Sequence, residues 1–259
     1  MPDEVSARLD GLTVLVARPE AQAGALCALI EAAGGRAIRL PLFAIEPGTD
    51  SAAAASALAD ARHFDRWLFT STNAVDHAAA LCPPPWPRLA AVGTVTAAAL
   101  TKLTGQPVLT PPAGDGAAAL LTHPELRQLD GQRMLIVTGE QTLPILEDGL
   151  RARGAAVTVL AVYRRIAIAH APETIASLIA QADAAVIPSA EALRQLCALT
   201  PPQAAATLRA LQLAVPSPRV LETARTLGFT RMPLLPERVS DVAYLEVLRR
   251  HACHRPSNA

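Results

Sequence analysis

Lysine is almost absent from this sequence, since Lys102 is the only one beside 22 arginines. The Gly-Lys-Ser/Thr signature of a phosphate-binding loop is therefore missing, and Schiff-base chemistry would have to use Lys102. No Gly-x-Gly-x-x-Gly follows any apolar run, which disfavours a dinucleotide-dependent oxidoreductase. The four cysteines are far apart and form no Cys-x-x-Cys pair. The sequence thus suggests neither a zinc site nor a disulfide framework.

Net charge is also lacking, because 23 Lys and Arg residues balance 23 Asp and Glu residues. A nucleic-acid-binding protein needs a basic face to neutralise phosphates, so we expect no nucleic-acid partner. The sequence has no run of 18 apolar residues, and its N-terminus is polar and acidic without an apolar segment. We therefore expect a cytoplasmic protein that does not bind membranes. Half of the residues are apolar, which is enough for a sizeable core.

Two segments of the sequence are similar at an offset of 120 residues. GLTVLVARPE begins at Gly11 and GQRMLIVTGE begins at Gly131, and the similarity continues for about 30 residues. Each segment has the pattern of a strand, a polar turn, an amphipathic helix, a glycine and a second strand. Gly34 and Gly154 stand where a helix end favours a left-handed residue. The strands expected in these segments include Leu12–Val16, Arg36–Leu42 and Ala156–Val162.

The repeat extends, more loosely, through the rest of the chain. The segment from Phe64 resembles the segment from Ala182, and the one from Leu89 resembles the one from Leu213. Strands therefore alternate with helices throughout, a pattern that gives parallel sheets with helices on both faces. Two such sheets suit this length better than one sheet of about ten strands. We expect an α/β protein with two parallel-sheet, flavodoxin-like domains.

Small polar residues follow several of the expected strands. In FTSTNAV, from Phe69, an apolar run breaks into hydroxyl and amide side chains before a helix begins, and AVGTVT and VIPSAEA have a similar form. Ligands of open α/β sheets bind at such strand ends, where the free N–H groups of a helix start favour anions. These side chains could equally be N-caps that only stabilise helices, by about 1 kcal/mol each. The candidate binding residues are Arg18, Ser71, Thr72, Asn73, Gly93, Thr96, Thr138, Ser189 and Arg219.

Arg18 follows the first expected strand and has two interpretations. It could meet a carboxylate of a ligand, or it could pair with Glu20 or Glu46 on the surface.

The order and spacing of six segments resemble the uroporphyrinogen-III synthase family over about 230 residues. These segments are VLVARPE, FTSTNAV, AVGTVTAAAL, RARGAAVTVLAVYRR and, more weakly, VIPSAEAL and GFTRMPLLPE. The resemblance implies two α/β domains, joined by a two-stranded linker, with an interdomain cleft and no cofactor or metal. It implies a discontinuous first domain at 1–41 and 164–259 and a second domain at 44–162. This agrees with the crossings expected near 40–47 and 161–167, where the two best-matched repeat blocks end.

The resemblance also implies a reaction, catalysed by a cyclising lyase. Hydroxymethylbilane, a linear tetrapyrrole, would lose water, undergo inversion of ring D through a spiro intermediate, and close to uroporphyrinogen III. The substrate carries eight carboxylates, which a ring of neutral donors can hold without a basic patch. No His/Asp pair or carboxylate dyad stands out, in agreement with catalysis mainly by positioning.

Tyr163 is the candidate catalytic residue. It lies in the segment VYRR, and its counterpart in the first repeat is Phe43, so packing alone does not require a hydroxyl there. In the resembling family the tyrosine of this motif points into the cleft, where it can donate a proton or hydrogen bond to the departing hydroxyl. The alternative is an interfacial aromatic residue whose hydroxyl meets solvent.

The second half of the sequence departs from the family pattern. Pro188 stands where a threonine is expected, Pro216 replaces a glycine, and Arg219 replaces a threonine. A glycine-arginine pair is replaced by Thr142-Leu143. A catalytically silent homologue that binds a tetrapyrrole or a protein partner is therefore the alternative function. A third hypothesis, a two-domain protein of the periplasmic type that closes on a small anion, is disfavoured by the missing signal sequence. We expect a monomer, with transient hand-over from the enzyme that makes hydroxymethylbilane.

Overall fold

The computed structural model describes residues 9, 11–141 and 144–253. The chain forms two compact units: unit 1 contains Met1–Ala44 and Ala167–Ala259, and unit 2 contains Ile45–Ile166. The chain passes from one unit to the other inside β3 (Phe43–Pro47) and returns inside β8 (Ala156–Ala167). Each unit has its own sheet, with a hydrophobic core on both of its faces.

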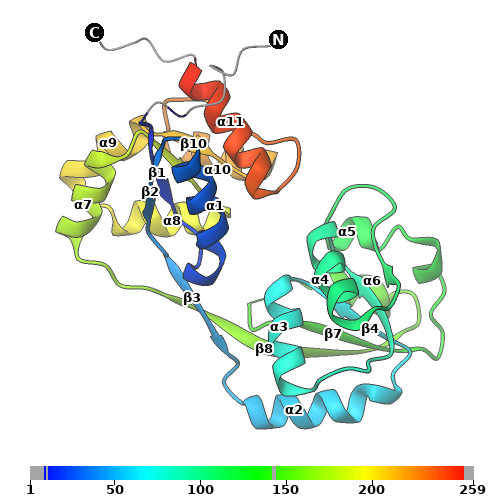
Figure 1. The fold of residues 1–259 in the computed structure, drawn as a ribbon. Helices are drawn as coiled ribbons and strands as arrows, with labels where there is room; N and C mark the ends of the chain where they lie inside the picture. The colour runs from blue at the N-terminus through cyan, green and yellow to red at the C-terminus, as the bar shows by residue number, and fades with distance from the viewer. Residues whose placement is uncertain (1–8, 10, 142–143, 254–259) are drawn as a thin grey trace. The chain divides into compact units, whose positions relative to one another are not determined.

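Unit 1 contains a four-stranded parallel sheet in the order β10-β9-β1-β2. Its strands are β1 (Thr13–Val16), β2 (Arg36–Arg39), β9 (Ala184–Val186) and β10 (Gln212–Ala214). One face is covered by α1 (Glu20–Ala32) and α11 (Asp241–Cys253). The other face is covered by α7 (Pro172–Gln181), α8 (Ala190–Leu199), α9 (Ala205–Ala210) and α10 (Pro218–Thr226), with the 3₁₀ helix η4 (Pro202–Ala204) before α9 (Figure 1). Because both faces are covered, β1 is apolar at nearly every position.

Unit 2 contains a six-stranded sheet in the order β3-β8-β7-β4-β5-β6. Besides β3 and β8, its strands are β4 (Arg66–Phe69), β5 (Arg88–Ala91), β6 (Val108–Leu109) and β7 (Arg133–Gly139). One face is covered by α2 (Ser51–Asp60), α3 (Thr72–Leu81) and α4 (Thr94–Thr104), with η2 (Ala61–His63) following α2. The other is covered by α5 (Ala117–Leu120), η3 (Pro124–Leu126) and α6 (Ile145–Arg151) (Figure 1).

The β3 strand departs from the parallel arrangement expected from the sequence. The Ile168 N–H donates to the Leu42 carbonyl, whereas the Gly48 N–H donates to the Val162 carbonyl. The partners run in opposite directions along the two strands, so β3 lies antiparallel to β8. An ion pair of 3.0 Å between Arg164 Nη2 and Glu46 Oε2 joins the same strands. The remaining strand pairs of this sheet are parallel.

The internal repeat predicted from the sequence is confirmed by the strand orders of the two sheets. The order β10-β9-β1-β2 in unit 1 corresponds to β5-β4-β7-β8 in unit 2, as the paired segments require. Matching glycines also have matching backbones: φ is 74° at both Gly11 and Gly131, 83° at Gly34 and 91° at Gly154. The last two glycines follow helices, where the left-handed conformation frees them from the penalty of a Cβ atom.

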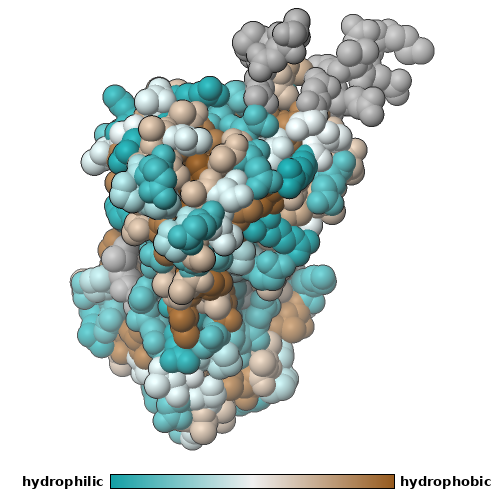
Figure 2. All heavy atoms as spheres, turned by 90° about the vertical axis from the view of Figure 1, so that its left-hand side faces the viewer, coloured by the Kyte–Doolittle hydropathy of each residue, from teal (hydrophilic) through white to brown (hydrophobic). Residues whose placement is uncertain are grey.

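Hydrophobic surface is divided into small areas on the face shown in Figure 2, where hydrophilic side chains separate them. In the described part of the chain, no helix combines the length and apolar character that a membrane span requires.

Candidate functional site

Unit 2 brings Ser71 and Tyr163 together, although 92 residues separate them in the sequence. Ser71 follows β4 and is the N-cap of α3, where its Oγ accepts the Ala74 N–H at 3.1 Å. The Ser71 Oγ also lies 3.1 Å from the Tyr163 hydroxyl. Tyr163 belongs to β8 and is only 7% exposed. Its hydroxyl therefore has a protein partner, which differs from the solvent-facing aromatic considered from the sequence.

A β-bulge places Tyr163 opposite Gly139. The register of β7 and β8 pairs Thr138 with Ala161 and then Gly139 with Tyr163, so β8 has one extra residue. Bulges of this kind redirect a side chain. A Cβ atom added at Gly139 would lie 2.6 Å from Tyr163 Cζ and 3.0 Å from its hydroxyl oxygen. The ring thus occupies the space that a side chain at position 139 would need.

His77 lies against the ring of Tyr163. The rings of His77 and Tyr163 stack with centroids 5.7 Å apart and an angle of 28° between their planes. His77 belongs to α3, the helix that Ser71 caps. Burial lowers the pKa of His77, while the charge of Asp76 opposes that shift. Ser71 and His77 of α3 and Gly139 of β7 therefore all lie next to the Tyr163 side chain.

Thr138 does not present a free hydroxyl at the end of β7. Thr70 Oγ1 donates to Thr138 Oγ1 at 2.8 Å, and the Thr138 residue is 2% exposed. This bond ties the carboxyl end of β4 to that of β7, two strands that are neighbours in the sheet. Thr72 and Asn73 begin α3 and are half-buried.

The start of α4 is already occupied by a carboxylate of the chain. Asp115 Oδ1 accepts the Thr94 N–H at 2.9 Å, and a Cβ atom at Gly93 would lie 3.0 Å from the same oxygen. Gly93 is the N-cap of α4, and Thr96 is 6% exposed. Thr96 is therefore neither the cap nor a hydroxyl displayed at the helix start, in contrast to the capping role considered from the sequence.

Arg18 follows β1 in unit 1 and makes an ion pair that neither sequence alternative named. Its Nη1 lies 2.5 Å from Asp241 Oδ1, and its guanidinium lies 5.0 Å from the centre of the Tyr244 ring. Burial raises the pKa of Tyr244 to about 12. Glu20 and Glu46, the partners proposed for Arg18, bond instead to other arginines: Arg39 and Arg164. Helix α11 thus provides both partners of Arg18.

The other candidates of unit 1 lie at the starts of α8 and α10. Ser189 caps α8 and accepts the Ala192 N–H at 3.1 Å. Arg219 is exposed on the first turn of α10, which Ser217 precedes as the N-cap. Pro188 and Pro216 lie just before these helices and are half-buried. Unit 1 therefore has its own set of candidate residues at the carboxyl ends of its strands.

Some site residues were not found from the sequence. His77, Gly139 and Asp115 contact candidate residues but carry no motif of their own. The spacing of His77 from Asn73, four residues along a helix, was the one available signal that it lies on the same helix face. The proximity of Gly139 to Tyr163 could not be predicted without knowing the β-bulge. Thr142-Leu143, singled out in the sequence, lies outside the described residues. Among the described residues, no three His, Cys, Asp or Glu side chains gather as metal ligands.

Ser71→Ala and Ser189→Ala form a matched pair for measuring the Tyr163 contact. Both serines cap ten-residue helices and accept a backbone N–H at 3.1 Å. We expect each substitution to lower the free energy of unfolding by about 1 kcal/mol through the lost cap. Ser71→Ala should cost about 1 kcal/mol more, because the buried Tyr163 hydroxyl loses its partner. Urea unfolding followed by circular dichroism tests this, and equal losses would contradict a stabilising Ser71–Tyr163 bond.

Stability should depend on pH through His77. An unfolded chain protonates histidine as pH falls through about 6.5, whereas the folded unit resists protonation of His77 because burial lowers the pKa of this side chain. The unfolded state then binds more protons, so the free energy of unfolding decreases as pH falls below about 6.5. Urea midpoints measured at about pH 7.5 and 5.5 should show a smaller loss in His77→Phe. His63→Phe, which replaces an exposed histidine, should keep the full loss.

Most of the chain is similar in sequence to known proteins. The sequence model of a family described as uroporphyrinogen-III synthase HemD matches residues 24–238. The chain is 33% identical to uroporphyrinogen-III synthase of Escherichia coli K12 over 227 residues, which cover 84% of this chain and 92% of that protein. It is 31% identical to the Salmonella typhimurium LT2 protein of the same name, with the same coverage.

Solved structures show the same fold. A mutant uroporphyrinogen III synthase from the extremely thermophilic bacterium Thermus thermophilus aligns with a TM-score of 0.65 at 22% identity, over 94% of this chain and all of that chain. The uroporphyrinogen-III synthetase of Helicobacter pylori 26695 aligns with a TM-score of 0.59 at 12% identity, over 91% of this chain and 97% of that chain. The family match over residues 24–238 and the 33% identity to the Escherichia coli protein show that the chain belongs to the uroporphyrinogen-III synthase family.

Proposed function

We propose that this protein is a uroporphyrinogen-III synthase that converts hydroxymethylbilane to uroporphyrinogen III, with loss of water and inversion of ring D. The observation that carries the proposal is the Ser71–Tyr163 pair, whose oxygens lie 3.1 Å apart. Both residues lie in segments through which the family resemblance runs. Ser71 lies where β4 ends and α3 begins, and Tyr163, inside β8, lies opposite Gly139 at the carboxyl end of β7. The carboxyl ends of strands are the usual place for a ligand in an α/β sheet.

Tyr163 is proposed to help the hydroxyl of the substrate leave. The hydroxyl departs as water once it receives a proton, and a tyrosine carries a proton that it can donate at neutral pH. Ser71 Oγ accepts or donates in its contact with Tyr163, because either atom of this pair can be the donor. When the Tyr163 proton points to the substrate, the Ser71 hydroxyl can turn to donate to the tyrosine oxygen. The pair thus offers a proton donor, the Tyr163 hydroxyl, whose position is fixed by its hydrogen bond with Ser71.

Substrate carboxylates are proposed to bind the strand-to-helix turns of both units. Unit 2 contributes Ser71, Thr72 and Asn73 at the start of α3, and unit 1 contributes Arg18, Ser189 and Arg219. A substrate held by both sets would lie in the interdomain cleft that the family resemblance implies. Its ends would be held so that ring closure takes place at the substituted carbon, which is catalysis by positioning.

Binding of a substrate carboxylate at the start of α4 depends on one condition. Asp115 already accepts the Thr94 N–H, so a substrate carboxylate binds there only if it displaces the Asp115 carboxylate. The side chains of Thr96 and Thr138 are buried, and Gly93 has no side chain. We therefore propose that these three residues shape the backbone of the site and do not donate hydroxyl hydrogen bonds to the substrate. A substrate carboxylate can likewise pair with Arg18 only if it displaces Asp241, because the Arg18 guanidinium pairs with that residue.

The isomer formed from fresh hydroxymethylbilane tests the proposed function. Uroporphyrinogen III is expected, formed faster than the spontaneous closure to the uninverted isomer. If only isomer I forms, at the rate of the blank, the protein is instead a silent homologue that binds a tetrapyrrole or a protein partner. Pro188 and Pro216 favour that alternative, because each removes an N–H donor from a turn of unit 1. We also propose that the protein acts as a monomer in the cytoplasm, with transient hand-over of the substrate.

A further inference from the structure

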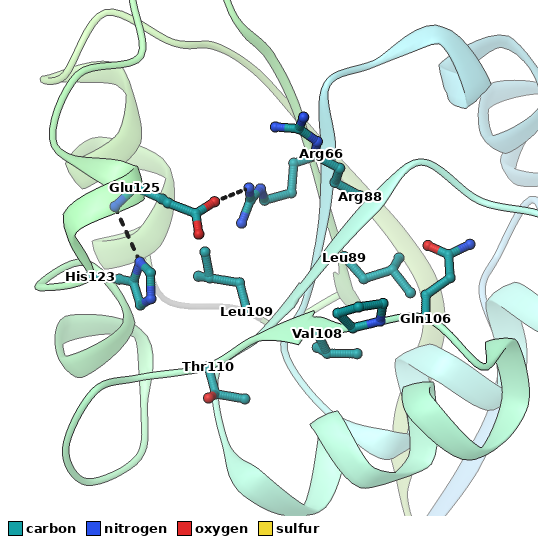
Figure 3. Close-up of a pocket in the computed structure, with 10 residues that line it drawn as sticks. Arg66, Arg88, Leu89, Gln106, Val108, Leu109, Thr110, His123 and Glu125 are labelled. Carbon is teal, nitrogen blue, oxygen red and sulfur yellow. Dashed lines mark hydrogen bonds and ion pairs between the residues drawn. The ribbon is translucent and has the colours of Figure 1, made fainter.

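A pocket of about 510 Å³ lies in unit 2, at the end of the sheet opposite to Ser71 and Tyr163. Its lining includes the first residues of β4 and β5, Arg66 and Arg88, and His123 and Glu125 at η3, and its other polar residues are Gln106 and Thr110 (Figure 3). Val108 and Leu109 of the edge strand β6 line its apolar side. The volume is in the range of small-molecule sites.

Two arginines stand side by side in this pocket. Arg66 and Arg88 are register partners on neighbouring parallel strands. Like charges in such positions repel each other. Arg66 is also largely removed from water, since its side chain is 8% exposed. A buried guanidinium is costly unless an anion pairs with it, so this arrangement needs negative charge nearby.

Glu125 supplies part of that charge. Arg66 Nη2 donates to Glu125 Oε2 at 2.7 Å, and this bond, with the nearby charges of His123 and Arg88, lowers the pKa of Glu125. Glu125 is nevertheless 58% exposed, so water competes for it. In the described part of the chain Arg88 forms no ion pair, so Glu125 pairs with Arg66 alone.

We propose that this pocket binds a small organic carboxylate, a molecule with one carboxylate group and an apolar body. The carboxylate would bridge Arg88 and Arg66, whose planar guanidinium groups suit bidentate pairing. The apolar body would lie against Val108 and Leu109 at the open edge of the sheet. A purely inorganic anion would leave that apolar wall in contact with water. The pocket is thus a second ligand site, at a distance from the strand ends where substrate is proposed to bind.

Benzoate is a suitable probe, with benzamide as its neutral analogue of the same shape and inorganic phosphate as an anion without an apolar body. Titration followed by NMR of backbone amides should give a dissociation constant of about 1 mM or below for benzoate. The shifted amides should belong to residues 106–110 and 123–125. Benzamide should not bind measurably. Benzoate shifts confined to residues 71–77 and 163, or phosphate binding as tightly as benzoate, would overturn the proposal.

Three substitutions have three different expected effects on benzoate binding. Arg88→Gln should weaken benzoate binding at least about tenfold, because a charged hydrogen-bond donor is lost. Glu125→Gln should strengthen binding several-fold, because it removes the competing negative charge and keeps an oxygen for Arg66. Arg127→Gln removes an exposed charge near η3 that does not line the pocket, and should change nothing. If the Arg88 and Arg127 substitutions weaken benzoate binding equally, the binding depends only on the overall surface charge, and the proposed site is refuted.

The measurement is separate from the proposed function, because it needs no hydroxymethylbilane. Uroporphyrinogen III formation by Arg88→Gln should equal that of the unchanged protein. Melting curves of the variants establish that each remains folded during the titrations.

Discussion

Tyr163→Phe is expected to lower the turnover of hydroxymethylbilane by about 10- to 100-fold while the protein remains folded. Phenylalanine keeps the ring beside Gly139 and His77 but removes the hydroxyl that lies 3.1 Å from Ser71 Oγ. The departing hydroxyl of the substrate then loses its proposed proton donor. The rate of uroporphyrinogen III formation under saturating substrate measures this effect, and circular dichroism measures the fold.

Tyr244→Phe is the matched control, because Tyr244 is the other tyrosine and is also buried. The phenylalanine introduced at this position would still offer its ring to the Arg18 guanidinium. We expect turnover close to that of the unchanged protein. If Tyr163→Phe turns over substrate at the full rate, Tyr163 has no part in the mechanism and catalysis rests on positioning by the turns.

Gly139→Ala should reduce turnover at least as much as Tyr163→Phe, although position 139 carries no functional group. The new Cβ atom would lie 2.6 Å from Tyr163 Cζ and 2.8 Å from Cε2. The ring or the strand must shift, and overpacking of this kind costs about 1–3 kcal/mol of stability. The shift also breaks the geometry of the Ser71 contact. Turnover and the urea midpoint should therefore fall together.

Gly24→Ala provides the control for the glycine substitution itself. A Cβ atom at Gly24 meets only Arg39 Nη2, at 4.0 Å, within a helix where alanine is favoured. This variant should be as active and at least as stable as the unchanged protein. The double variant of Gly139→Ala with Tyr163→Phe should lose little more activity than either single variant, since both act on one hydroxyl. Additive losses would show that Gly139 acts without Tyr163.

Most of the secondary structure could be predicted because it depends on local patterns. The apolar runs and left-handed glycines of the repeat predicted β1, β7 and the ends of the first helices in each segment. Strand ends were predicted less well: β2 ends at Arg39 rather than Leu42, and β8 continues to Ala167 rather than ending at Val162. The β8 extension lies beside β3, and that pairing connects residues more than 100 positions apart, which no local pattern records.

The candidate site was predicted as a set of residues but not as a set of contacts. Ser71 and Ser189 are N-caps, as the alternative interpretation of their turns allowed. Thr96 and Thr138 were treated as available hydroxyls, yet both are buried, because each lies on the side of its element that faces the core. A hydroxyl in a short polar motif gives no indication of which face it occupies until the neighbouring strand is known.

The amino-acid sequence by itself determined the alternation of strands and helices, the internal repeat and the family resemblance, since all three are written in the order of residues along the chain. Only the tertiary structure decided that Tyr163 meets Ser71, that Asp115 occupies the α4 start, and that Arg66 stands beside Arg88. These contacts join residues 21 to 92 positions apart. The physical reason is that strand register and a single bulge set which side chains meet, and both result from packing of the whole unit.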